Sequence, residues 1–267
     1  MDIKKIGNLQ IAYRKGTADE ETVDSMFKND TYFVPPYIPR SGDIIMDIGS
    51  HIGTFSLFAA SKIKNAKIFA IEACRENFRY LEKNVTMNNF KNIAIYNFAL
   101  SDARGPTKLY HDIWSGSVGH SLTMAFSERN EDSEEIWADT LTNFMKSYNI
   151  NDCDYARFNC EGSEFKIILN TPKEILRRIS IINILYHEDL IKGFTGRDLI
   201  DYLKKCGFAV TTRILPIEGY GKDGKPKRGI IVALRKNNKV LENIYRFSSY
   251  SKTITRHLRV IVNKKIF

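Results

Sequence analysis

From Asp43 onward, short apolar runs alternate with amphipathic segments, and few folds accommodate such an alternation. The apolar runs are five to eight residues long, as in 179–186, which suits strands that are buried on both faces. The segments between them carry apolar residues at helical spacing, as Phe78, Leu81 and Val85 do. This alternation predicts an α/β fold in which a mostly parallel sheet has helices on both faces. We expect strands over residues 44–48, 66–71, 93–98, 154–158 and 179–186, and helices over residues 53–63, 75–88, 139–148, 163–170 and 195–206.

The last two expected strands, 208–214 and 229–234, follow each other without a helix between them. A turn-rich loop separates them, which predicts an antiparallel hairpin at the edge of the sheet. Between the third and fourth strands, residues 99–153 are less regular than the rest. Their Ser/Gly-rich stretch, 115–121, is either a loop that closes over a substrate or a loop exposed to solvent.

The length of 267 residues suits one large α/β domain with short appendages. Three prolines between Tyr32 and Pro39 exclude a regular helix there. We therefore expect an N-terminal cap over 1–41, a doubly wound α/β domain over 42–235, and a C-terminal tail over 236–267 that is helical in part.

Positive charge gathers in the tail. From Arg235 onward, nine Lys and Arg residues stand against one acid, Glu242, so this stretch carries eight of the nine net positive charges. Ile254, Leu258 and Ile261 share one face of the helix expected there. A basic helix with an apolar stripe suits an anionic membrane surface or an acidic protein, and a solvated helix packed on the domain is the alternative. The nearly neutral body argues against a nucleic-acid partner.

No apolar run approaches the roughly 18–20 residues that a transmembrane helix needs, and the N-terminus lacks the apolar core of a signal peptide. The four cysteines form no CxxC pair, which argues against a zinc site or a redox dithiol. We therefore expect a cytoplasmic protein with reduced thiols, which the tail can attach to a membrane surface.

Two glycines and a carboxylate follow the first expected strand, in the segment Asp47-Ile-Gly-Ser-His-Ile-Gly53. Ligands of open α/β sheets bind at such strand ends, and glycine leaves room for them. The Gly-x-x-x-Gly spacing differs from the Gly-x-Gly-x-x-Gly of turns that bind pyrophosphate, which suits a nucleoside ligand without phosphate. Glu72 ends the second strand, where a carboxylate can accept hydrogen bonds from both ribose hydroxyls.

These features predict a site for S-adenosylmethionine. We expect Asp47 to accept a hydrogen bond from its ammonium group or from an ordering water, and Ala99 or Leu100 to form an apolar wall beside the adenine. A tight turn without a ligand, and Glu72 as a helix-capping acid, are the alternatives. The expected cofactor-binding residues are Asp47, Gly49, Ser50, His51, Gly53, Glu72, Ala73, Ala99 and Leu100.

Four segments, 47–53, 71–73, 97–102 and 160–164, together resemble the FkbM family of methyltransferases. The resemblance covers roughly residues 40–210 and implies a Rossmann-like class I methyltransferase with a seven-stranded, mostly parallel sheet of order 3-2-1-4-5-7-6, whose last strand is antiparallel. It also implies methyl transfer to oxygen, commonly a hydroxyl of a sugar, glycan or polyketide. Asn159 stands where the family often has the first acid of Asp-x-Glu-Gly-x-Glu, which weakens the case for a carboxylate base or a metal ligand at that position.

Methyl transfer from a sulfonium needs an aligned acceptor oxygen and a group that removes its proton. We expect His187 to act as this base, because histidine titrates near neutral pH, and Glu161 to orient it or the acceptor hydroxyl. Glu164 and Asn159 complete the expected catalytic set. A structural role for His187, and a helix-dipole role for Glu164, are the alternatives. We expect no metal, because the spacing of these groups is not a metal signature.

The leading hypothesis is therefore an O-methyltransferase that acts on a hydroxyl of a sugar, glycan or related small molecule. An RNA methyltransferase is one alternative, although the basic residues lie in the tail rather than at the strand ends. The segment 159–162 also lacks the Asn-Pro-Pro-aromatic box typical of methylation at base amino groups. A non-catalytic binding protein that retains the fold is another, because Asn159 replaces an acid.

Overall fold

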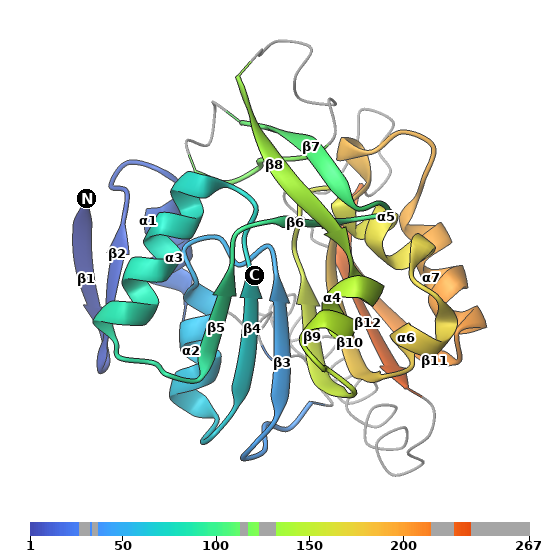
Figure 1. The fold of residues 1–267 in the computed structure, drawn as a ribbon, viewed down its shortest axis with the longest axis horizontal. Helices are drawn as coiled ribbons and strands as arrows, with labels where there is room; N and C mark the ends of the chain where they lie inside the picture. The colour runs from blue at the N-terminus through green and yellow to red at the C-terminus, as the bar shows by residue number, and fades with distance from the viewer. Residues whose placement is uncertain (27–32, 34–36, 113–116, 123–131, 215–226, 236–267) are drawn as a thin grey trace, which may run out of the picture.

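A sheet of seven strands runs through the centre of the molecule (Figure 1). The computed structural model describes residues 1–26, 33, 37–112, 117–122, 132–214 and 227–235. The strands are β3 (Ile44–Ile48), β4 (Lys67–Ile71), β5 (Ile93–Tyr96), β9 (Cys153–Phe158), β10 (Ile179–His187), β11 (Phe208–Ile214) and β12 (Arg228–Arg235). Their order is β11-β12-β10-β9-β3-β4-β5, which is 3-2-1-4-5-7-6 when the seven are numbered along the chain. As expected, only β12 runs antiparallel to its neighbours.

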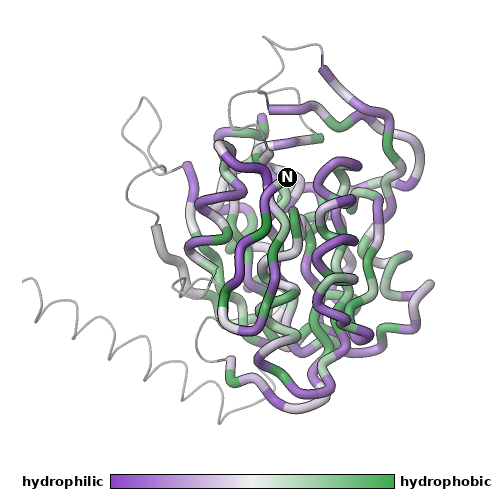
Figure 2. The backbone as a smooth tube through the Cα atoms, turned by 90° about the vertical axis from the view of Figure 1, so that its left-hand side faces the viewer, coloured by the Kyte–Doolittle hydropathy of each residue, from purple (hydrophilic) through white to green (hydrophobic). Residues whose placement is uncertain are grey.

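Helices cover both faces of this sheet. Those on one face are α2 (Thr54–Lys62) and α3 (Arg75–Met87), and those on the other are α4 (Leu141–Ser147), α5 (Ser163–Asn170), α6 (Lys173–Leu176) and α7 (Gly196–Lys205). Successive strand residues point to opposite faces, so Ile45 packs in a core with Phe55 and Leu81, whereas Met46 packs in a core with Phe165. Figure 2 shows the hydrophobic stretches of the chain gathered toward the interior of the molecule.

A second, three-stranded sheet occupies the region whose sequence is irregular. It consists of β6 (Ala99–Ser101), β7 (Gly105–Tyr110) and β8 (Ser133–Thr140), in the order β6-β8-β7. Figure 1 shows β7 and β8 above the edge of the central sheet where its parallel strands end. The third strand, expected over 93–98, ends at Tyr96, because the chain leaves the central sheet there and enters the three-stranded sheet at Ala99. The side chain of Asn97 donates to the carbonyls of Glu72 and Ala73, at 2.9 and 3.1 Å, as the chain turns from one sheet to the other.

The N-terminal segment forms a hairpin of β1 (Asp2–Ile6) and β2 (Leu9–Tyr13), followed by α1 (Ala18–Ser25). Asn84 of α3 holds this hairpin, because its side chain accepts from the backbone N–H of Ala12 at 2.6 Å and donates to the Ala12 carbonyl at 3.1 Å. Val23 of α1 and Ile11 of β2 are fully buried in the same core as α2 and α3. This segment is thus packed against the sheet domain.

The helix expected within the tail, 236–267, lies outside the described residues. Among the residues that are described, no helix is long and apolar enough to cross a membrane.

Candidate active site

A cavity of about 470 Å³ opens at the carboxyl ends of the parallel strands, the edge at which open α/β sheets bind ligands. The ends of β3, β4, β9 and β10 line it, together with α1 and residues 117–122. The volume lies in the range of small-molecule sites. The expected site residues that line the cavity are Gly49, Ser50, His51, Glu72, Ala73, Ala99, Leu100, Asn159, Glu161 and His187.

Asp47 does not line the cavity, contrary to expectation. Its carboxylate is fully buried, accepts a hydrogen bond from Ser56 Oγ at 2.7 Å, and lies 3.2 Å from Arg157 Nη1. Asp47 and Arg157 are directly opposite in the β3–β9 register, so their side chains share one face of the sheet. The carboxylate therefore joins β3 to β9 and α2.

The two glycines after β3 have different roles. Gly49 adopts a left-handed φ of 79°, and a Cβ there would lie 1.9 Å from the carbonyl oxygen of Asn159. The absence of a side chain thus lets the turn pass against the end of β9. Gly53 lies away from the cavity, and a Cβ there would lie 2.6 Å from Leu81 Cδ1. Gly53 therefore serves the packing of α2 on α3.

Glu72 stands at the tip of β4 as expected. Its carboxylate accepts from the backbone N–H groups of His51, at 2.7 Å, and Cys74, at 3.0 Å. Burial raises the pKa of Glu72, although nearby His51 and the two N–H groups oppose this shift. Ala99 and Leu100 line the same cavity, although they belong to β6 and not to the third strand.

The four expected catalytic residues lie together at the tips of β9 and β10. Glu164, in the first turn of α5, is fully buried and accepts from the backbone N–H groups of Cys160 and Gly162, at 2.8 and 2.7 Å. Its Oε1 also lies 3.1 Å from His187 Nδ1. On the other side of the ring, His187 Nε2 lies 3.4 Å from Glu161 Oε2. Glu164 thus lies behind the cavity wall, whereas Glu161 and His187 line it.

His187 does not have the neutral-range pKa that was expected of it. Burial alone would lower the pKa of this histidine, but the carboxylates of Glu161 and Glu164 outweigh burial and raise it to about 9. The pKa of Glu161 is itself raised, chiefly by burial. The two flanking carboxylates therefore favour the form of His187 that carries a proton on each ring nitrogen, and this form has no lone pair with which to act as a base.

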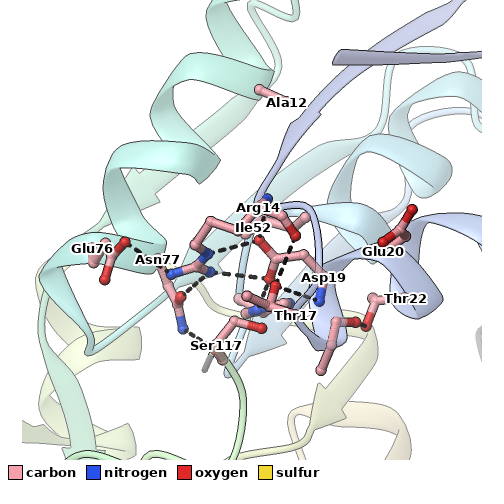
Figure 3. Close-up of polar contacts among 12 residues, drawn as sticks. Ala12, Arg14, Thr17, Asp19, Glu20, Thr22, Ile52, Glu76, Asn77 and Ser117 are labelled. Atoms are coloured by element: carbon pink, nitrogen blue, oxygen red, sulfur yellow. Dashed lines mark hydrogen bonds and ion pairs between the residues drawn. The ribbon is translucent and has the colours of Figure 1, made fainter. Parts of the chain in front are cut away.

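A buried ion-pair network in the N-terminal segment also reaches the cavity. Asp19 is fully buried, and its carboxylate lies 2.8 Å from both Arg14 Nε and His51 Nε2. Arg14 also donates to the Asn77 side chain of α3 (Figure 3). Burial opposes ionisation of Asp19, but His51 and Arg14 hold its pKa well below the usual range. In sequence Asp19 resembles any acid in the first turn of a helix, so no local signal identifies this network.

Part of the Ser/Gly-rich stretch lines the cavity, and residues 115 and 116 lie outside the described structure. The Asn77 side chain donates to the Ser117 carbonyl at 3.0 Å, and Ser121 Oγ donates to the Glu161 carbonyl at 2.5 Å. His120 also lines the cavity, and burial lowers its pKa to about 4. The described part of this stretch is therefore tied to both α3 and the β9–α5 turn.

A further cluster that the sequence does not reveal joins the three-stranded sheet to α3. Potential ligand atoms of Cys74, His111 and Glu134 lie within 4.8 Å of one another. Each ring nitrogen of His111 already faces a carboxylate, Asp132 at 3.2 Å and Glu134 at 3.3 Å. Glu134 also accepts from the backbone N–H of Arg75 at 3.0 Å. These contacts account for the cluster as a link between β8 and the start of α3.

The residues present fit S-adenosylmethionine. The Glu72 oxygens each accept one backbone hydrogen bond, and a carboxylate retains further lone pairs for the ribose hydroxyls. Asn159 Oδ1 is buried and, within the described part of the chain, has no hydrogen-bond partner. It is an acceptor for an ammonium group, which would remove the cost of an unsatisfied buried oxygen.

Comparisons with known proteins identify the family of this chain. The family described as "Methyltransferase FkbM domain" matches residues 47–210. AMB antimetabolite synthetase AmbE of Pseudomonas aeruginosa is 28% identical over 244 residues, which cover 78% of this chain and only 11% of that protein. Methyltransferase 1 of Beauveria bassiana is 22% identical over 212 residues, which cover 73% of this chain and 78% of that protein.

Solved structures also align with this chain, at low sequence identity. Methyltransferase FkbM from Methylobacillus flagellatus aligns with a TM-score of 0.49 and 12% identity, covering 75% of this chain and 45% of that chain. TYW2 of M. jannaschii in complex with AdoMet aligns with a TM-score of 0.42 and 12% identity, covering 87% and 84%. The family match spans more than half of the sequence, and the chain therefore belongs to the FkbM family of S-adenosylmethionine-dependent methyltransferases.

Proposed function

We propose that this methyltransferase acts on a hydroxyl oxygen of a sugar, a glycan or a related small molecule. The observation that carries the proposal is the series of Glu164, His187 and Glu161 at the tips of β9 and β10, in which Glu164 is hydrogen-bonded to His187 and Glu161 lies 3.4 Å from the other ring nitrogen. A hydroxyl must lose its proton as its oxygen is methylated, and this series ends in a carboxylate that lines the cavity.

The bound cofactor would supply a methyl group on a sulfonium, which is a good leaving group. Glu72 would accept hydrogen bonds from its ribose hydroxyls, and Ala99 and Leu100 would contact the adenine. Asn159 Oδ1 would accept from its ammonium group. Asp47 would act indirectly, through Ser50. The backbone carbonyl of Asp47 accepts a hydrogen bond from Ser50 Oγ at 2.8 Å within the glycine turn.

Helix α1 supports a hydroxylated acceptor. Glu21, Thr22 and Ser25 line the cavity. Thr22 Oγ1 donates to the Ala18 carbonyl at 2.9 Å, and Ser25 Oγ donates to the Thr22 carbonyl at 3.2 Å. Both hydroxyl protons are thus used within the helix, and the oxygens retain lone pairs that suit the donors of a polyol.

The charged residues that line the cavity argue against RNA as the acceptor. Carboxylates at Glu21 and Glu161 line the cavity, and a phosphate backbone favours basic surfaces. The two arginines that line it are engaged, since Arg157 pairs with Asp47 and Arg228 with Asp189, at 3.2 and 2.8 Å.

The test is methyl transfer from isotopically labelled S-adenosylmethionine to free sugars, lipid-linked glycans, tRNA and rRNA in parallel. We expect label in a sugar or glycan fraction, and a rate lower by about 10²–10⁴-fold in Glu161→Gln. Labelling of RNA alone would show that the acceptor class is wrong. Cofactor binding without transfer to any fraction would favour a binding protein.

A further inference from the structure

We propose that Glu161 receives the proton of the acceptor hydroxyl, and that His187, held by Glu164, positions this carboxylate. The inference rests on the proposed function and reverses the roles that residue type alone suggests. It follows from the contacts, the burial and the charges of the three side chains.

Glu164 is the fixed end of the series. Its side chain is fully buried, and its two oxygens accept from two backbone N–H groups as well as facing the histidine ring. It stands in the first turn of α5. Glu164 lies outside the cavity lining, so it has no access to a substrate proton.

His187 is the middle of the series, and both of its nitrogens face carboxylates. Glu164 lies 3.1 Å from Nδ1 and Glu161 lies 3.4 Å from Nε2. The nearby charge of Arg228 in β12 lowers the pKa of His187. Arg228 is itself paired with Asp189 at 2.8 Å. Two close anions favour the doubly protonated ring, in agreement with a pKa of about 9 for His187. A doubly protonated ring carries an N–H group on each side and has no lone pair with which to accept a proton.

Glu161 is the end that reaches the cavity. Its backbone adopts a left-handed φ of 49°, which is unfavourable for a residue with a side chain, and Ser121 holds its carbonyl at 2.5 Å. Its side chain is 18% exposed, compared with 4% for His187 and none for Glu164. Burial raises the pKa of Glu161, which makes its carboxylate a stronger base than an exposed one.

The proton balance of the step is simple. As the acceptor oxygen forms its bond to the methyl carbon, the bond between that carbon and sulfur breaks and sulfur keeps the electron pair. The hydroxyl proton passes to the free oxygen of Glu161, whose carboxylate becomes neutral. His187 stays charged throughout, and Glu161 afterwards releases its proton to solvent.

Two analogues of the cofactor test the position of Glu161, and the test needs no methyl acceptor. S-adenosylhomocysteine lacks the methyl group, and sinefungin carries an amine-bearing carbon in place of the methyl sulfonium. Calorimetry should show that Glu161→Gln lowers the preference for sinefungin over S-adenosylhomocysteine about tenfold, with affinity for the latter unchanged within twofold. Glu174→Gln, at an exposed acid of α6, should change neither affinity. Equal losses for both ligands in Glu161→Gln, or no loss, would overturn the proposal.

The charge of His187 is measured separately by nitrogen-15 NMR of the full chain with labelled histidine, using His187→Gln for assignment. We expect both ring nitrogens of His187 to stay protonated at pH 8, and Glu161→Gln to move the titration midpoint toward neutral pH. A ring with one proton at pH 7 would overturn the proposal. If neither ligand bound the unaltered protein, the proposed function would fail, while the NMR titration would still report on the series.

Discussion

At the scale of single residues, position within the sheet decides what each acid does. Asp47, Glu72 and Glu161 all follow or end parallel strands, yet they have different partners. Asp47 faces Arg157 on the adjacent strand and becomes a structural ion pair. Glu72 caps two backbone N–H groups at the cavity, and Glu161 faces a histidine. Residue type alone would assign all three the same chemistry.

Gly49 offers a direct test of the close approach between the glycine turn and β9. We expect Gly49→Ala to lower the free energy of unfolding by about 2–4 kcal/mol, because of backbone strain and overpacking, and to abolish cofactor binding. The control is Gly7→Ala, since Gly7 also has a left-handed φ, of +59°, but a Cβ there would have nothing within 4 Å. Urea denaturation measures the free energy of unfolding of both variants, and calorimetry measures their cofactor binding. Equal destabilisation by the two changes would contradict the role of the Asn159 contact.

The charge of His187 should make stability depend on pH. The pKa of His187 in the folded protein is about 9, above the usual 6.5, so its contribution is complete below about pH 6.5 and is lost as pH rises through 9. The contribution is at most about 3 kcal/mol. Urea unfolding at pH 6, 7.5 and 9 should show the difference between the unaltered protein and His187→Gln shrinking with rising pH. A difference that does not change with pH would contradict a charged ring.

At the scale of elements, the cavity is built by segments outside the central sheet as much as by its strands. Helix α1 supplies one wall, and its Asp19 joins β2, α3 and the glycine turn through Arg14 and His51. Residues 117–122 supply another wall and hold the backbone of Glu161. The helix therefore lines the cavity and contacts the glycine turn without containing any residue of the glycine motif.

We expect Asp19→Asn to destabilise the protein by about 3 kcal/mol, because it leaves the buried guanidinium of Arg14 without its main anionic partner. We also expect weaker binding of S-adenosylhomocysteine, because His51 loses the same partner. The matched control is Asp24→Asn in the same helix, where the pair with Lys4 is exposed and stability should stay nearly unchanged. Thermal unfolding and calorimetry give the two readouts. Unchanged ligand affinity in Asp19→Asn would show that α1 does not support the site.

At the scale of the whole molecule, most of the net charge lies in a different part of the sequence from the site residues. The sheet carries the site at one edge, whereas most of the net charge of +9 lies from Arg235 onward. We propose that this tail binds an anionic membrane surface or an acidic protein, which would place the enzyme close to its acceptor. The proposal rests on the composition of the tail.

Removal of residues 236–267 should leave the unfolding temperature of the sheet domain unchanged within a few degrees. Sedimentation with vesicles containing anionic lipid should show binding of the full chain at low salt and little binding of the truncated chain. Binding should weaken as salt is raised, because screening shortens the range of the attraction. If the full chain does not bind such vesicles even at low salt, the membrane version of the proposal is wrong.

Local pattern predicted most of the framework. The runs ending at Ile48 and Ile71 are strands, the segment 163–170 is a helix, and Glu72 stands at a strand tip, because periodicity and strand ends are properties of neighbouring residues. The three-stranded sheet was missed, because its pairs join β6 and β7 to a distant β8. Register between distant strands leaves little trace in local sequence.

By itself, then, the sequence determined the α/β framework, the cofactor edge and the set of chemical groups near it. Only the tertiary structure decided that Asp47 turns to Arg157, that α1 lines the cavity, and that His187 lies between two acids. The reason is physical. The pKa and the orientation of a side chain depend on burial and on charges brought within a few ångströms, and folding brings these together from segments that are far apart in the chain.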